Sequence, residues 1–277
     1  MPLRDLLCVL EAAEAPTAAL DQAVALARGY RAHARFEIAA PEVLVADTFY
    51  SAPVVSGIVA QDRAQTRARA DALAERVRAA SAAVGLGFEV DKRFEVLAEL
   101  LTVLKGRARC FDLVVMDRPG ALLGHGEALF EEMLFGTGRP VLVATPDRAP
   151  VGKVKHVVLA WDGSAQAAHV LSIALALFPE IKLVEVVSVA GEKDLSETVP
   201  GAEIAPHIER HGAEAKVFDL MMEKGGVAPV IDNFASDAKA DLIVMGGFGH
   251  SRWREFVLGG VTRALSKSAK TPLLLAH

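Results

Sequence analysis

Short apolar runs of about five to eight residues recur along the whole chain. Within each run the apolar residues follow one another without clean alternation with polar ones. Continuous runs of this kind are typical of parallel strands that helices cover on both faces of a sheet. The pattern predicts strands at Asp5–Leu10, Arg35–Ala40, Gly87–Phe94, Asp112–Met116, Pro140–Ala144, His156–Ala160, Lys182–Val189, Glu214–Met221, Asp241–Met245 and Pro272–Ala276.

Between these runs, apolar residues return at the spacing of one helix face. Strands that alternate with helices indicate right-handed βαβ units and a doubly wound, Rossmann-like α/β fold. Helices are predicted at Ala18–Tyr30, Arg63–Ala82, Leu97–Ala108, Glu127–Phe135, Ala165–Leu177, Ala205–His211, Val227–Ala238 and Leu258–Ala269.

The two halves of the chain are similar in sequence. Leu6–Glu11 matches Val157–Asp162, 151 positions later, whereas Phe111–Met116 matches Ala240–Met245, only 129 positions later. The shrinking offset means that the first half carries extra residues, mainly around Val43–Asp62, which we interpret as an excursion off the sheet.

This repeat predicts two tandem domains, at residues 1–146 and 153–277. Each falls within the usual size range of a domain. The boundary at Thr145–Lys153 has two prolines and a glycine among charged residues, as a short linker does.

A glycine-rich segment follows the predicted strand Asp241–Met245, and a helix is expected to begin near Gly259–Val261. Glycines permit close backbone approach, and a helix start offers free N–H groups to an anion. Open α/β sheets bind ligands at the carboxyl ends of their strands. The segment therefore suits phosphate, although glycines after a strand also serve as plain turn residues.

The spacing of Gly246, Gly249 and Gly259 resembles the nucleotide-binding signature G-x2-G-x9-G-(S/T) of the universal stress protein family. Val157–Ser164 looks like that family's first strand and Asp-Gly-Ser turn, and Lys270–Leu275 looks like its closing strand. The resemblance covers the second half and, more weakly, the first, and implies a five-stranded, mostly parallel sheet in each domain.

In one branch of the family the resemblance also implies bound ATP, with AMP or ADP as related ligands. Carried over to this chain, Asp162 faces the adenosine end of the nucleotide. The glycines named above surround the phosphates, and Met245 and Val261 flank them. Gly260 stands where the family has Ser or Thr, so a hydroxyl contact is lost while the backbone N–H remains.

The first half departs further from the signature. Asp117 replaces the first glycine, Pro119 removes a backbone donor, and Glu11 stands where Asp162 stands in the second half. Because the Asp117 carboxylate would repel a phosphate, we interpret the first domain as a structural or regulatory partner that has lost nucleotide binding. The closing strands Pro140–Ala144 and Pro272–Ala276 are expected to pair across a pseudo-twofold axis, as in dimers of the family.

Composition narrows the function further. The chain has 30 Lys and Arg against 35 Asp and Glu, a net charge of −5, which argues against a nucleic-acid partner. Two cysteines exclude a disulfide scaffold and a four-cysteine zinc site. No apolar run reaches the roughly 20 residues of a membrane span, and the N-terminus has no signal-peptide pattern, so we expect a cytoplasmic protein.

Other patterns give little support for catalysis. His207 and His211 have the spacing of a metal pair, but a third ligand is missing and a solvated helix face explains them better. Ser164 has no evident histidine base, and there is no Walker lysine. The basic stretch His250–Arg254 either reaches the phosphates or packs Trp253 against a neighbouring domain.

Three functions follow, in this order. The first is a tandem universal stress protein that binds an adenine nucleotide through its second domain and regulates a stress response, with the two domains paired internally and further homodimerisation open. The second, from another class, is weak ATP hydrolysis at the same site, with Asp162 or His250 acting. The third is a ligand-free interaction protein in which both nucleotide sites are vestigial. The feature that supports this third function is Gly260, which stands in place of Ser or Thr.

Overall fold

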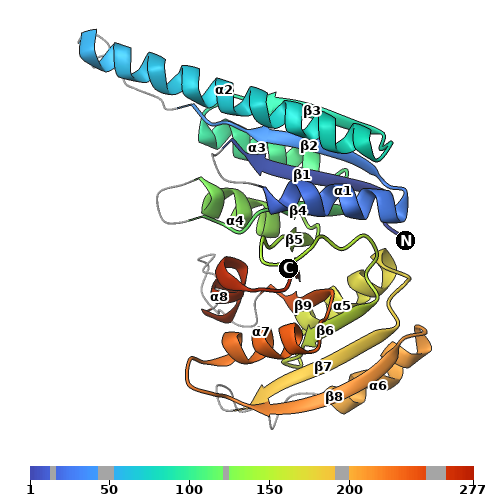
Figure 1. Cartoon of the computed structure of the whole chain (residues 1–277). Coiled ribbons are helices and arrows are strands. Elements are labelled where there is room, and N and C mark those ends of the chain that lie inside the picture. Colours follow the sequence, from blue (N-terminus) through green and yellow to red (C-terminus); the bar gives the residue numbers. More distant parts are fainter. Residues whose placement is uncertain (13–16, 43–52, 121–124, 191–199, 248–259) are drawn as a thin grey trace.

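The computed structural model describes residues 1–12, 17–42, 53–120, 125–190, 200–247 and 260–277 (Figure 1). Its strands form one ten-stranded sheet in the order β3-β2-β1-β4-β5-β10-β9-β6-β7-β8. The strands are β1 Asp5–Glu11, β2 His33–Ala39, β3 Phe88–Arg93, β4 Leu113–Met116, β5 Val141–Val143, β6 His156–Ala160, β7 Leu183–Ala190, β8 Glu214–Met221, β9 Leu242–Gly246 and β10 Leu273–Ala276.

Each half of the sheet has five strands in equivalent order, and all pairs within a half are parallel. This confirms two doubly wound α/β halves with five strands each. Among the described strands, one pair is antiparallel: it joins β5 to β10, with Leu142 opposite Leu274. Both leucines are fully buried. The expected pairing of the two closing strands is therefore present, and it makes one sheet of two.

Helices cover both faces of the sheet, and each face has its own apolar core. One core contains buried residues of α1, α2, α5 and α6, and the other contains those of α3, α4, α7 and α8. The helices are α1 Ala18–Tyr30, α2 Pro53–Ala83, α3 Leu97–Ala108, α4 Gly126–Gly136, α5 Ala165–Leu177, α6 Gly201–Arg210, α7 Val227–Asp237 and α8 Gly260–Ser268. None of the described helices is long and apolar enough to cross a membrane.

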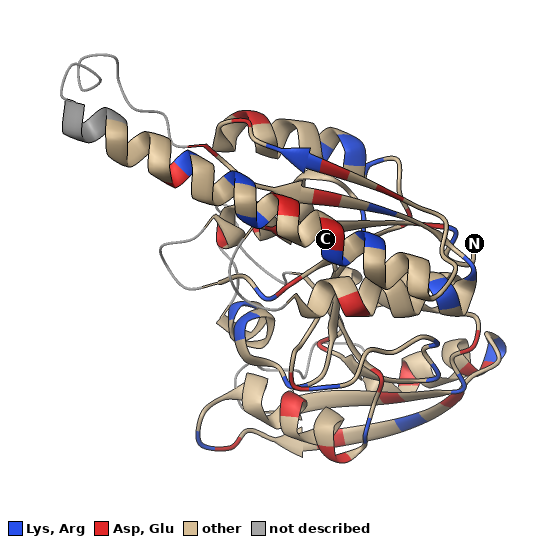
Figure 2. Cartoon of the chain, turned by 45° about the horizontal axis from the view of Figure 1, so that its top comes forward, with Lys and Arg blue, Asp and Glu red and all other residues tan. Residues whose placement is uncertain are grey.

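The main correction concerns α2. The predicted helix begins at Arg63, but α2 begins at Pro53, so the last ten residues of the expected excursion are helical. Proline suits a helix start because its missing N–H has no intrahelical partner there. The helix projects past the sheet and carries charges of both signs (Figure 2). Ile58 is 62% exposed, and none of residues 57–62 is buried, so this described stretch has no buried apolar face. Residues 43–52 lie outside the described part.

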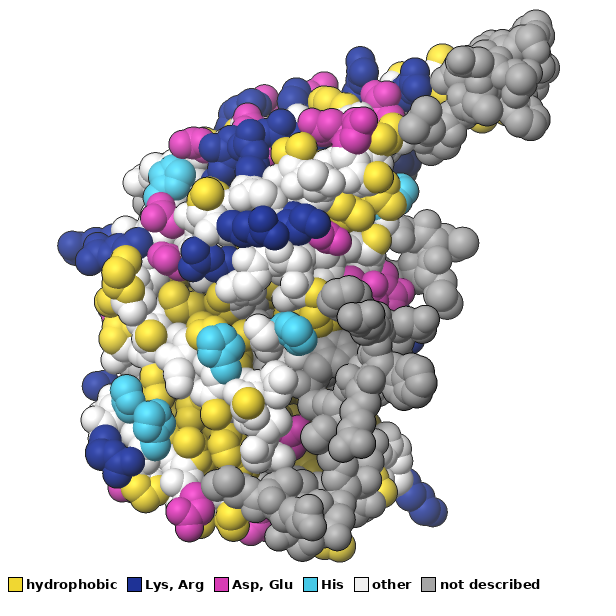
Figure 3. Space-filling model, turned by 180° about the vertical axis from the view of Figure 1, so that it is seen from behind, with side chains coloured by type: hydrophobic (Ala, Val, Ile, Leu, Met, Phe, Trp, Pro, Cys, Tyr) yellow, Lys and Arg dark blue, Asp and Glu magenta, His cyan; other side chains and the backbone are white. Residues whose placement is uncertain are grey.

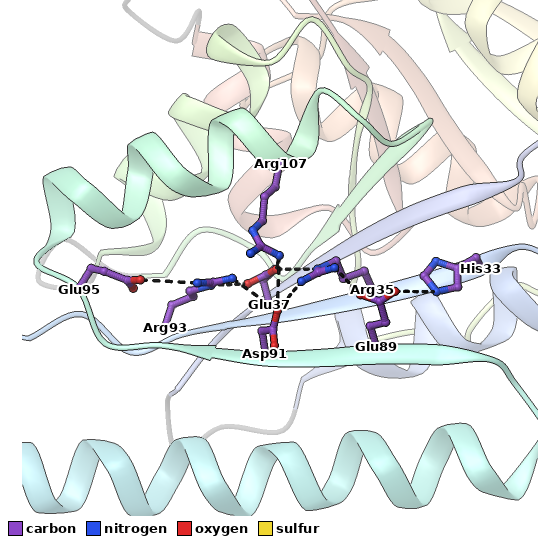
Figure 4. Close-up of polar contacts among 8 residues, drawn as sticks. All are labelled: His33, Arg35, Glu37, Glu89, Asp91, Arg93, Glu95 and Arg107. Atoms are coloured by element: carbon purple, nitrogen blue, oxygen red, sulfur yellow. Dashed lines mark hydrogen bonds and ion pairs between the residues drawn. The ribbon is translucent and has the colours of Figure 1, made fainter.

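An ion-pair network around the buried Glu37 joins α3 to β2 and β3 (Figure 4). Glu37 in β2 is completely buried, and its carboxylate accepts 2.8 Å hydrogen bonds from Arg35, Arg93 and Arg107. Asp91 in β3 also contacts these three arginines. The hydrogen bond to Glu37 raises the pKa of the Arg93 guanidinium. Through Arg107, the network joins α3 to the sheet.

Candidate functional site

The first part of the candidate site is the turn between β6 and α5. Trp161 is buried after the end of β6, and Gly163 has φ +72°, which favours glycine. The Asp162 carboxylate accepts a hydrogen bond from Ser164 N at 3.1 Å. The Ser164 hydroxyl in turn accepts one from Ala167 N at 3.1 Å, so Ser164 caps α5. This turn holds Asp162, partly exposed, at the carboxyl edge of the sheet.

The second part is the end of β9, which lies beside β6. Ala160 pairs with Met245, so Gly246 reaches the same sheet edge as Asp162. A Cβ atom on Gly246 would lie 2.8 Å from Ala167 N and from Gln166 C. These are backbone atoms of the first turn of α5, so only glycine fits at 246. Met245 and Gly246 are both partly exposed.

The third part is the start of α8. Gly260 is its first residue, is exposed, and has no heavy atom within 4 Å of the position where a Cβ would stand. Val261 is partly buried against the core below, and Thr262 is 3% exposed, so Thr262 belongs to the core. Gly249 and Gly259, with the stretch His250–Arg254, lie outside the described residues.

The structure thus brings Asp162, Met245 and Gly246 to one edge. The sequence did not point to the first turn of α5 as a neighbour of Gly246. The Asp-Gly-Ser turn was the available signal, because a serine after such a turn is a common N-cap.

Polar contacts connect α8 to the first half of the chain. The Glu127 carboxylate of α4 lies 3.2 Å from both Arg263 and Lys267 of α8. Arg118, which follows β4, donates to the carbonyl of Ala269 and lies 2.5 Å from Asp147. The helix that opens at Gly260 is therefore held by charged groups of the other half.

Other candidate groups do not assemble into sites. The rings of His207 and His211 are 4.6 Å apart, but the described residues contain no group of three or more His, Cys, Asp or Glu that could hold a metal. Cys8 is buried, and burial raises the pKa of its thiol, whereas Cys110 is exposed. In the upper part of the face seen in Figure 3, basic and acidic side chains lie beside one another.

Comparisons with known proteins agree on one family. Residues 153–277 match the Universal stress protein family. The chain is 31% identical over 137 residues to universal stress protein MJ0531 of Methanocaldococcus jannaschii, covering 44% of this chain and 81% of that protein. It is 27% identical over 185 residues to universal stress protein Slr1230 of Synechocystis sp., covering 64% of this chain but only 61% of that relative's length.

Solved structures show the same fold over nearly the whole chain. The crystal structure of a universal stress protein from Archaeoglobus fulgidus superposes with a TM-score of 0.68 at 17% identity, covering 98% of this chain and 97% of that one. A putative universal stress protein from Pseudomonas aeruginosa superposes with a TM-score of 0.53 at 16% identity, covering 99% and 93%.

Proposed function

Because the chain belongs to the universal stress protein family, we propose that residues 153–277 form a domain that binds ATP, or the related AMP or ADP, in a stress response. The observation that carries this proposal is the contact of Gly246 with the first turn of α5. A glycine there lets the first turn of α5 lie directly against the end of β9 beside Asp162, where any side chain would collide with the helix backbone.

The residues at this edge fit an adenine nucleotide by their chemistry. A carboxylate such as Asp162 accepts hydrogen bonds from hydroxyl or amino groups of the adenosine end. The start of α8 at Gly260 offers backbone N–H groups and the positive end of a helix dipole to phosphate. Gly249 and Gly259 complete the proposed set, with Met245 and Val261 as apolar neighbours. When bound, the nucleotide supplies the phosphate charge that these donors neutralise.

Titration of the purified chain with ATP by calorimetry tests the proposal. We expect one site in the second domain, weakened at least tenfold by Asp162→Ala, which removes a contact, and by Gly246→Val, whose side chain displaces the first turn of α5; a tenfold change corresponds to about 1.4 kcal/mol. Asp219→Ala changes an exposed aspartate on β8 and serves as the control that leaves affinity unchanged. Absence of binding at millimolar nucleotide, and of co-purified nucleotide by mass spectrometry, would contradict the proposal and favour a ligand-free interaction protein.

We also propose that the two halves form an internal pseudo-dimer in which the first half tunes the nucleotide site. The antiparallel pairing of β5 with β10 and the contacts of Glu127 with α8 support this arrangement. Since β5 and β10 use each other's edges, any further homodimer has to form through other surfaces. Light scattering of the purified chain measures that state directly.

Removing the charge of Glu127 is expected to strengthen nucleotide binding about two- to threefold. Glu127 neutralises Arg263 and Lys267, so Glu127→Gln leaves α8 more positive toward an anionic ligand. The gain should shrink as salt rises, because these groups are partly exposed. Glu132→Gln is the matched control, since Glu132 lies on the same helix but pairs with Lys105 of the first half. Equal effects of the two variants would rule out this role of Glu127.

A further inference from the structure

The two halves place different residues at the same structural position. In the first half Val9 pairs with Met116, and in the second half Ala160 pairs with Met245. Asp117, which follows β4, is therefore the counterpart of Gly246, which ends β9. By the same register Glu11, which ends β1, is the counterpart of Asp162.

Asp117 contacts the start of a helix at the position where Gly246 lies against one. Its Oδ1 atom accepts a 2.9 Å hydrogen bond from Ala19 N, in the first turn of α1. That helix begins at Ala18, whose counterpart at the offset of 151 residues is His169, one turn inside α5. The Asp117 carboxylate accepts a hydrogen bond from the first turn of α1, whereas a side chain at 246 would collide with the first turn of α5.

The start of α1 also lacks the cap that its counterpart has. Thr17 is the N-cap residue, with extended backbone, but its side chain accepts no capping hydrogen bond. Thr17 is only 5% exposed, and its buried hydroxyl has no hydrogen-bond partner among the described residues. In α5 the equivalent task is done by Ser164. The donors at the start of α1 are thus served by Asp117, from 98 positions along the chain.

Glu11 does the same at the start of α4. His125 is the N-cap of this helix, and its backbone N–H donates to Glu11 Oε1 at 3.2 Å. A Cβ on Gly126, the first residue of α4, would lie 2.9 Å from Glu11 Oε2. The glycine therefore allows the carboxylate to lie against the helix start. In the second half, the corresponding helix is α8, which starts at Gly260.

The two carboxylates thus serve the starts of two helices, and their charges interact. Burial raises the pKa of Asp117, the backbone N–H groups of Ala19 and Ala18 oppose this, and the nearby charge of Glu11 raises it further. Two neighbouring carboxylates are stabilised when each accepts hydrogen bonds from N–H donors. Here the donors are the starts of two helices.

We propose that the first domain contains an oxyanion site, formed by the starts of α1 and α4, whose ligands are the chain's own Asp117 and Glu11 carboxylates. When one of these carboxylates is removed, the site can bind a small oxyanion such as inorganic phosphate in its place. The inference rests on the proposed function only where it treats the matching place in the second domain as a phosphate site.

Chemical rescue of Asp117→Gly in the full chain tests this inference. In Tris buffer without multivalent anions, we expect the variant to unfold about 4 °C below the unchanged protein, since a helix loses its cap. Inorganic phosphate at constant ionic strength should restore at least half of this loss along a saturation curve. Asp112→Gly is the control, because Asp112 also accepts two backbone N–H bonds, from Arg4 and Asp5, but at no helix start.

A second variant covers the case in which Asp117→Gly folds poorly. Asp117→Asn keeps the side-chain volume and an acceptor oxygen, so it should lose less thermal stability and gain nothing specific from phosphate. The inference is overturned if phosphate stabilises Asp117→Gly no more than the unchanged protein and Asp112→Gly, or if it stabilises Asp117→Asn equally. ATP titration of Asp117→Gly measures nucleotide binding by the second domain separately. Failure of the proposed function can therefore be distinguished from failure of this inference.

Discussion

Replacing Glu37 with alanine is expected to lower the free energy of unfolding by about 3 kcal/mol. Glu37 is fully buried, and three guanidinium groups, those of Arg35, Arg93 and Arg107, point at its carboxylate (Figure 4). Without it, Asp91, which is 43% exposed, is the carboxylate that still contacts all three guanidinium groups. Removing one partner of a buried ion pair is costly because the remaining charge loses both its counterion and its hydration.

Urea unfolding followed by circular dichroism measures this loss. The control is Asp71→Ala, since Asp71 is 61% exposed and pairs only with Lys92 among the ion pairs described for it. Exposed pairs contribute at most about 1 kcal/mol, so the control should change stability little. A loss for Glu37→Ala no larger than that of Asp71→Ala would mean that the arginines reach solvent freely and that the network does not hold α3 in place.

Gly29→Ala is expected to cost about 3 kcal/mol, at the upper end of the usual range for overpacking. Gly29 lies in the last turn of α1, and a Cβ there would stand 1.8 Å from the carbonyl oxygen of Gly152. That oxygen belongs to the segment that connects the two halves, so the clash is with backbone and no side chain can turn away to relieve it. Either α1 or the connecting segment has to move.

The matched control is Gly106→Ala near the end of α3. Gly106 is also a helical glycine, but no heavy atom lies within 4 Å of its added Cβ. Alanine there should stabilise the protein by about 0.5–1 kcal/mol, because it reduces the conformational freedom of the unfolded chain. The comparison uses midpoints and slopes of denaturant unfolding. Equal stability of the two variants would show that α1 does not approach the connecting segment so closely in solution.

Much of the fold was predictable because its signals are local. Continuous apolar runs mark strands buried on both faces, and the predicted strands agree with the structure to within about two residues at each end. The apolar runs that lead to Asp162 and Met245 form two paired strands in the structure. Both residues therefore lie at one edge of the sheet, and the two runs could be recognised from the sequence. The start of α2 was missed because the projecting turns show no buried face with helical periodicity.

Contacts between residues far apart in sequence were not predictable in the same way. Glu37 stands within a strand next to other charges, and nothing local distinguishes it from a solvated residue. Its burial depends on Arg93 and Arg107, which lie 56 and 70 positions away. Asp117 was expected to repel phosphate, but its actual role as a helix cap depends on Ala19, 98 positions earlier.

By itself, the sequence determined the family and the α/β class, because each depends on patterns within short windows. Only the tertiary structure decided that the two sheets join through β5 and β10, that Gly29 has no room for a side chain, and that Glu11 and Asp117 serve the starts of two helices. Such contacts follow from the packing of whole elements. A carboxylate or glycine has the same local pattern whichever distant backbone it meets.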